Sequence, residues 1–306
     1  MATDISLKGE KFKQLPADIP DPLRSLNCSG CSNLKNLIGS PRKVNDLNAK
    51  KCTSLTSLEG SPDEVFDALY VDECSSLTSL SGGPSYVDIV SAQHCDNLKD
   101  LKGSPKRVNT YWLSNSGIES LEGCSETVQY IDVAYCKKLK SLKGCPHEVN
   151  ALKLYASGIV TFEGCAKVVN ADIDAQDCDN LVSLHGLPEV LRGGLYLSGC
   201  DKLLSLDGAP KTVMGNVKLQ KTNLTSLQGI GTKYFLTING RLYVDDKIKS
   251  HALGLLLIKG LTGIHGDFLG LDIIMKHFKE DGVDNDVLID CQYELIDAGF
   301  DDLGQL

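Results

Sequence analysis

The sequence VNDLNAKKCTSLTSLEGSP, residues 44–62, contains a pattern that the chain repeats with a spacing of 20 to 22 residues. The end of this stretch has the form Leu-x-x-Leu-x-Gly. That unit recurs in register with glycine at Gly39, Gly60, Gly82, Gly103, Gly123, Gly144, Gly164, Gly186, Gly208 and Gly229. A fixed short period predicts stacked structural units, each too small to bury its apolar face alone.

Apolar residues alternate with other residues just before the position of Cys52, as in Leu47 and Ala49. A period of two over a few residues predicts a short strand with one buried face. Because each unit repeats this strand in the same direction, the strands are expected to pair in parallel in one curved sheet. The predicted inward pairs are Leu26/Cys28, Leu47/Ala49, Leu69/Val71, Val90/Ala92, Tyr111/Leu113, Ile131/Val133, Leu152/Leu154, Ile173/Ala175, Leu195/Leu197, Val217/Leu219 and Leu236/Ile238.

A small residue closes each predicted strand, and its identity changes with the length of the following loop. Where it is cysteine, the next leucine stands three residues on, as in Cys52 to Leu55. Where it is serine, the loop is one residue shorter, as in Ser116 to Ile118. Such coupling is expected if the side chain satisfies backbone groups of an adjacent unit. The closing residues are Cys31, Cys52, Cys74, Cys95, Ser116, Cys136, Ser157, Cys178, Cys200 and Thr222.

The pattern Leu-x-x-Leu-x-Val-x-x-Cys-x-x-Leu-x-x-Leu resembles the leucine-rich-repeat family, from about Phe12 to Gly240. The resemblance implies a leucine-rich-repeat solenoid of the α/β horseshoe type, with about 11 short parallel strands, over residues 1–240. It also implies a binding function exerted through the concave sheet. The short, proline-containing unit is similar to the repeats of secreted bacterial ubiquitin-ligase effectors, with cysteine largely in place of the asparagine of the usual ladder.

The region after residue 240 loses the repeat, and residues 241–306 are predicted to form an acidic helical cap. Helical spacing covers His251 to Lys259 and Asp267 to Phe278. A last helix is expected to be capped by Asn285 or Asp286 and to be stopped by Gly299. The closing residues 291–300 resemble the ends of uncharacterised leucine-rich-repeat proteins of tailed bacteriophages. That resemblance implies expression in a bacterial host and inhibition of a host defence protein.

The composition limits the classes of function. Of 306 residues 42% are hydrophobic, and the net charge is -9. The acidic residues gather after residue 279, where nine of them stand without lysine or arginine. An acidic balance argues against nucleic acid as a partner. The first residues have no apolar segment of signal-peptide type, and no stretch of the sequence is apolar over the length that spans a bilayer. A cytoplasmic protein with free thiols is therefore expected.

The side chains between the inward pairs are expected to point to the concave surface of the sheet, where a partner protein would bind. Tyrosine and tryptophan dominate the energetic centres of protein interfaces, and the single Trp112 falls on this surface. The predicted binding residues are Tyr70, Asp72, Gln93, Trp112, Asp132, Tyr135, Tyr155, Asp174 and Tyr196.

Other interpretations are weaker. Cys28-x-x-Cys31 has the spacing of half a zinc site, but no second pair exists and both positions fit the repeat. Lysines in neighbouring loops, from Lys99 to Arg107 and from Lys137 to Lys143, form either an acidic-partner site or an ordinary solvated edge. An enzyme of ubiquitin-ligase type would have to act through Cys291. We therefore expect a non-enzymatic protein-binding module without cofactor, metal or membrane contact, with a structural scaffold as the other alternative.

Overall fold

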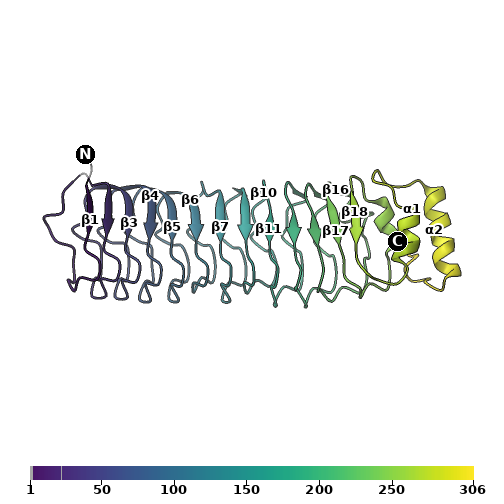
Figure 1. Ribbon diagram of the computed structural model, residues 1–306, viewed down its shortest axis with the longest axis horizontal. Helices are drawn as coiled ribbons and strands as arrows, with labels where there is room; N and C mark the ends of the chain where they lie inside the picture. Colours follow the sequence, from purple (N-terminus) through teal and green to yellow (C-terminus); the bar gives the residue numbers. More distant parts are fainter. Residues whose placement is uncertain (1–2, 22) are drawn as a thin grey trace. The chain divides into compact units, whose positions relative to one another are not determined.

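The computed structural model describes residues 3–21 and 23–306, and its fold is a parallel β-solenoid of about twelve turns with two α-helices near the C-terminus (Figure 1). The chain divides into two compact units, residues 1–152 and 153–306. Helical structure in the described residues occurs only after residue 252, so the segments between strands are loops and turns. The predicted solenoid fold is confirmed.

The first unit contains a row of parallel strands that pair in chain order. Their registers place Leu26 beside Leu47, Leu47 beside Leu69 and Val90 beside Tyr111. The first strand pairs Ile5 with Leu26 and was not predicted from the sequence. The row consists of β1 (Asp4–Ser6), β2 (Ser25–Asn27), β3 (Lys43–Asn48), β4 (Glu64–Tyr70), β5 (Tyr86–Ser91), β6 (Arg107–Trp112), β7 (Tyr130–Asp132) and β9 (Ala151–Lys153), the last at the boundary of the units. The short strand β8 (Glu148–Val149) lies outside this row.

The second unit contains two rows of parallel strands. The main row pairs Ile173 with Leu195, Leu195 with Val217 and Val217 with Leu242. It consists of β11 (Ile173–Asp174), β13 (Leu195–Tyr196), β15 (Val217–Lys218), β17 (Arg241–Tyr243) and β18 (Gly263–His265). The second row consists of β12 (Val190–Leu191), β14 (Thr212–Val213) and β16 (Thr237–Ile238), and β10 (Val168–Val169) precedes it.

The register of the last turns corrects one sequence prediction. Leu236 and Ile238 are not the inward pair of the main row, because Ile238 in β16 pairs with Val213 of the second row. Leu242 takes the inward position beside Val217, 25 residues later in the chain. The turn is longer because the segment after Gly229 adds a tight backbone turn that ends at Tyr234. Parallel pairing therefore continues past Gly240 to β18.

The core of each turn consists of the predicted inward residues and the leucines of the repeat. Leu47, Ala49, Leu55 and Leu58 are all fully buried. The same positions are buried in the second unit. In the first unit the inward Tyr111 is also fully buried, and its hydroxyl is hydrogen-bonded to the Ser104 hydroxyl. Stacking of identical layers thus gives a continuous apolar interior within each unit.

The closing cysteines form a ladder of thiol hydrogen bonds between successive turns. Each thiol donates to the carbonyl of an inward residue one turn earlier, for example Cys95 Sγ to Val71 O at 3.1 Å and Cys200 Sγ to Ala175 O at 3.1 Å. Where the loop is one residue shorter, a backbone N–H also bonds to the preceding turn: Gly117 N donates to Cys95 O at 3.0 Å. The predicted structural role of these cysteines is confirmed.

The residue before each ladder position is held in the left-handed region, although it is rarely glycine. Glu73, His94 and Tyr135 have φ of 58°, 56° and 60°. This conformation turns the N–H of residue 94 onto the carbonyl of Ser114 at 3.1 Å. It extends the parallel ladder beyond the strand, which offsets part of the steric cost of positive φ.

The C-terminal segment folds as a 3₁₀-helix and two α-helices, η1 (Leu253–Leu257), α1 (Leu271–His277) and α2 (Asn285–Asp297). The last helix is capped by Asp284, whose side chain accepts from Val287 N at 3.0 Å, and not by Asn285 or Asp286. Sequence placed the cap one or two residues late because all three residues are good N-caps. Gly299, with φ of 81°, follows the end of α2 as predicted.

Candidate functional site

Two columns of side chains lie on the solvent side of the main strands. The first, which we call the strand-end column, stands four residues before each ladder residue or at the equivalent strand position. The second, the turn column, stands two residues before the ladder residue. Parallel pairing aligns the strand-end column as Asn27, Asn48, Tyr70, Ser91, Trp112 and Asp132 in the first unit, and as Asp174, Tyr196, Lys218, Tyr243 and His265 in the second.

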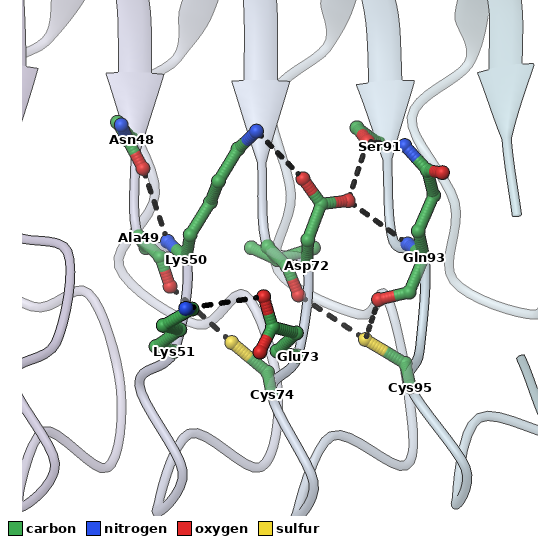
Figure 2. Close-up of polar contacts among 11 residues, drawn as sticks. Asn48, Ala49, Lys50, Lys51, Asp72, Glu73, Cys74, Ser91, Gln93 and Cys95 are labelled. Atoms are coloured by element: carbon green, nitrogen blue, oxygen red, sulfur yellow. Dashed lines mark hydrogen bonds and ion pairs between the residues drawn. The ribbon is translucent and has the colours of Figure 1, made fainter.

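Asp72 in the turn column connects three adjacent turns of the first unit (Figure 2). One carboxylate oxygen accepts hydrogen bonds from the Ser91 hydroxyl and from the backbone N of Gln93, the latter at 2.9 Å. The other lies 2.9 Å from Lys50 Nζ. With an exposed fraction of 6%, Asp72 is a buried connector. Its carboxylate serves the sheet, and Lys50 and Gln93 present the accessible atoms.

In the strand-end column, the side chains of aspartate and asparagine accept hydrogen bonds from the backbone N two residues ahead. Asn48 Oδ1 accepts from Lys50 N at 3.1 Å, and Asp132 Oδ1 accepts from Ala134 N at 2.9 Å. Asp174 Oδ1 accepts from both nitrogens of Gln176, at 3.3 and 3.0 Å. These are Asx turns, which Asp and Asn favour because the side chain mimics a backbone turn. Two of the predicted binding aspartates therefore shape the ends of strands.

The predicted aromatic residues of the first unit are only partly exposed. Tyr70 and Trp112 are half-buried and lie on strands two apart, with the buried Ser91 between them. The ammonium of Lys50 lies 4.5 Å from the centre of the Tyr70 ring. Tyr135 is 47% exposed, but it occupies the left-handed turn after β7 and not the strand itself.

The second unit presents an aromatic and cationic row along four neighbouring strands, which we call the 196–265 row. It consists of Tyr196, Lys218, Tyr243 and His265 in register. Lys218 Nζ lies 5.2 Å from the ring centre of Tyr196 and 5.8 Å from that of Tyr243. Tyr243 stacks on His265 with ring centres 4.7 Å apart and planes 13° apart. Contacts of this kind hold the three rings and the ammonium in place before any partner binds.

An open hollow of about 1090 Å³ adjoins this row within the second unit. Tyr155 and Gln176, from earlier turns, line it together with Lys218 and His265. Its charges are mixed, because Lys221 and Lys247 face Asp177, Asp245, Asp246 and Asp267. Burial raises the pKa of Tyr196 above its ordinary value, with Asp172 and Asp174 adding to the effect, so its hydroxyl remains a hydrogen-bond donor at neutral pH.

Sequence reasoning missed Tyr243 and His265 because it ended the array at Gly240. A signal was present, since Leu242 and Val244 alternate around Tyr243 as inward pairs do elsewhere. Of the nine predicted residues, the structure brings Tyr70, Asp72, Gln93, Trp112 and Asp132 onto neighbouring strands or turns of the first unit. In the second, Tyr155 lines the hollow and Tyr196 belongs to the row.

The cysteines have environments that suit structure. Cys28 and Cys31 are buried, and no group of three or more metal-binding side chains occurs in the described part of the chain. Burial, with the nearby Glu294 adding to it, raises the pKa of the Cys291 thiol to about 11, and that side chain is fully buried on α2. A catalytic cysteine needs an accessible thiol with a lowered pKa, which is the opposite arrangement.

The lysine-rich loops of the first unit are partly neutralised by ion pairs. Lys102 and Lys143 lie 3.0 and 2.7 Å from the two carboxylate oxygens of Glu122, and Lys102 also contacts Asp100 at 2.9 Å. Hydrogen bonds from Lys143 and Lys102 lower the pKa of Glu122 to about 2. This pairing favours the interpretation of a solvated edge over that of a phosphate or acidic-partner site.

Comparisons with known proteins assign neither a family nor a function to this chain. No family model matches the chain, and no curated protein matches it. Among solved structures, YopM from Yersinia enterocolitica WA-314 is similar over 84% of this chain and 81% of that one, with 14% identity and a TM-score of 0.25. The resemblance of residues 291–300 to phage proteins has no support in these comparisons. In the described residues, no helix is long and apolar enough to cross a membrane.

Proposed function

We propose that this chain is a protein-binding module whose contact surface in the second unit is the 196–265 row together with the adjoining hollow. The observation that carries the proposal is Lys218 held between Tyr196 and Tyr243, with His265 stacked on the second ring. Ring and ammonium groups that are already ordered lose little entropy on binding, and aromatic residues are the commonest energetic centres of interfaces.

The mixed charge of the hollow supports a protein partner. Nucleic-acid sites carry an excess of lysine and arginine, whereas Lys218 and Lys221 here are accompanied by Asp177, Asp245 and Asp267. A complementary partner would be a protein surface that carries both signs of charge and an apolar side chain able to pack against the tyrosines. In the first unit, Tyr70 and Trp112 supply a second aromatic surface of the same kind.

The test is affinity capture with the full chain, followed by identification and direct titration of the captured partner. A double substitution, Lys218→Ala with Tyr243→Ala, should weaken binding at least about tenfold, which corresponds to 1.4 kcal/mol. The matched control replaces Val160 and Val182 with serine, because these exposed loop residues neither belong to the 196–265 row nor line the hollow. Equal affinity of the row variant and the wild type, with unchanged circular dichroism, would refute the proposal.

We propose further that the module is non-enzymatic and works in a reducing compartment such as the cytoplasm. Twelve free cysteines support this, since the ladder needs protonated thiols as donors. A thiol-reactive probe under native conditions should leave Cys291 unlabelled. Labelling of Cys291 as fast as a free peptide thiol would revive the ligase alternative.

A finer proposal is that the chain is phage-encoded and inhibits a host defence protein. Only the resemblance of residues 291–300 to phage proteins supports it. Expression of the chain in bacteria with a single defence system should restore plaque formation by a sensitive phage, and the Lys218→Ala, Tyr243→Ala variant should not. Failure of every defence system to respond would remove this proposal while leaving the binding surface testable.

A further inference from the structure

The last helix, α2, has two different apolar faces. The inner face consists of Leu288, Cys291 and Leu295, which are buried where α2 packs against α1 and η1. The outer face consists of Ile289, Tyr293 and Ile296, which are 45%, 64% and 42% exposed. At 3.6 residues per turn the two faces point roughly 130° apart. The outer residues therefore leave a large part of their apolar surface exposed to solvent.

The outer stripe has the spacing of a helix-binding surface. Ile289, Tyr293 and Ile296 follow one another at four and three residues, so their side chains form one line along the helix. Solvent-exposed isoleucine and tyrosine in such a line stand out on a helix whose other exposed residues are all polar. A partner helix would fit between them by the ordinary packing of apolar ridges and grooves.

Charge beside the stripe selects the partner. Asp286, Asp290 and Asp297 are exposed and lie next to the stripe on one side, beyond Tyr293 on the helical wheel. From residue 280 to the end there is no lysine or arginine. A second copy of α2 would bring the same acidic edge into contact and be repelled, whereas a basic helix would be attracted.

We propose that the outer face of α2 binds an amphipathic helix of another protein, with lysine or arginine beside its apolar stripe. This surface is separate from the 196–265 row and uses different residues. It gives the acidic C-terminal region a role beyond capping the solenoid. The proposal stands or falls independently of the function proposed above.

The experiment titrates the full chain with labelled synthetic helices of 18 residues, followed by fluorescence anisotropy. One helix has leucine at helical spacing and lysine elsewhere, the second has glutamate in place of lysine, and the third is a scramble of the first. The lysine helix should bind at least tenfold more tightly than the other two. Raising the salt concentration should weaken it, because the acidic edge is exposed.

Variants locate the surface. Ile289→Ser with Tyr293→Ser should lose at least tenfold in affinity for the lysine helix, and Asp290→Asn with Asp297→Asn should lose several-fold together with most of the salt dependence. Val182→Ser with Leu204→Ser, exposed apolar residues elsewhere in the second unit, should bind as the wild type does. The single change Tyr293→Lys, at the most exposed position, should give a similar loss with an unchanged melting curve if the double variant is unstable.

Two outcomes overturn the proposal. The first is equal affinity for the lysine helix and its scramble, or equal affinity of the α2 variants and the wild type. The second is a dimer in sedimentation equilibrium that dissociates in the Ile289→Ser, Tyr293→Ser variant, because the face would then be occupied by a second copy of the chain.

Discussion

Replacing one ladder cysteine tests whether the thiols hold successive turns together. In Cys95→Ala the carbonyl of Val71 loses a donor that lies 3.1 Å away in a fully buried site. An unsatisfied buried carbonyl costs about 1–3 kcal/mol, and the space left by the sulfur adds about 0.5 kcal/mol. We expect the free energy of unfolding of the unit to fall by about 2 kcal/mol.

The serine variant at the same position separates hydrogen bonding from packing. Cys95→Ser keeps a donor, but its shorter bond to Cβ leaves the oxygen farther from Val71 O than the sulfur is. We expect a loss of about 1 kcal/mol, between wild type and alanine. The control is Cys124→Ala, a thiol that is more exposed and outside the ladder, with a loss of no more than about 1 kcal/mol.

Urea unfolding followed by circular dichroism measures these differences, and an unchanged slope would show that the same surface is exposed in each variant. The reasoning is refuted if Cys95→Ala lies within 0.5 kcal/mol of the wild type, taking about 0.5 as the size of an ordinary surface effect. It is also refuted if serine destabilises as much as alanine.

Three further changes test other parts of the structure. Stability should fall as the pH rises above about 8.5, because burial raises the pKa of Cys95 and of Cys200 to about 12. Each thiol contributes fully below its unfolded pKa, and roughly 1.5 kcal/mol per thiol is lost by pH 10. A flat urea midpoint from pH 8 to 10 would contradict this. Asp72→Ala should lower the free energy of unfolding by about 2 kcal/mol, since Ser91, Gln93 and Lys50 lose their acceptor. Asp72→Asn should recover at least half of this loss in the same urea titration. Identical losses in the two variants would show that the acceptor is unimportant. Gly117→Ala should lower the free energy of unfolding by about 3 kcal/mol or more, because its Cβ would lie 2.0 Å from Asp96 O. In the control Gly263→Ala the Cβ meets no atom nearer than 3.7 Å, so this variant should unfold as the wild type does. Coinciding thermal melts of the two variants would contradict this expectation.

The repeat made most of the fold predictable from the sequence. Leu47 and Ala49 alternate as an inward pair, and Cys52 closes the strand in the register that the structure shows. The prediction failed where the period changed. Between Val217 and Leu242 the turn is 25 residues long, so a template with a period of about 21 assigned Leu236 and Ile238 to the wrong strand.

The candidate site was less predictable because alternation shows direction and not accessibility. Asp72 and Asp132 lie on the solvent side of the sheet, but both are buried. Asp72 is hydrogen-bonded to the next turn, and Asp132 to the backbone two residues ahead. The stacking of Tyr243 on His265 depends on two turns that the sequence did not reveal as part of the array. Side chains that meet across turns can be located only once the register is known.

Photo-crosslinking in cells tests whether the 196–265 row is a binding surface. Tyr243 is replaced by a benzophenone amino acid in the full chain, the source cells are irradiated, and adducts are identified by mass spectrometry. The same substitution at the exposed Val160 serves as the control. We expect one discrete protein adduct at position 243 and none at 160. Adducts at 160 alone, or the same adducts at both positions, would contradict it.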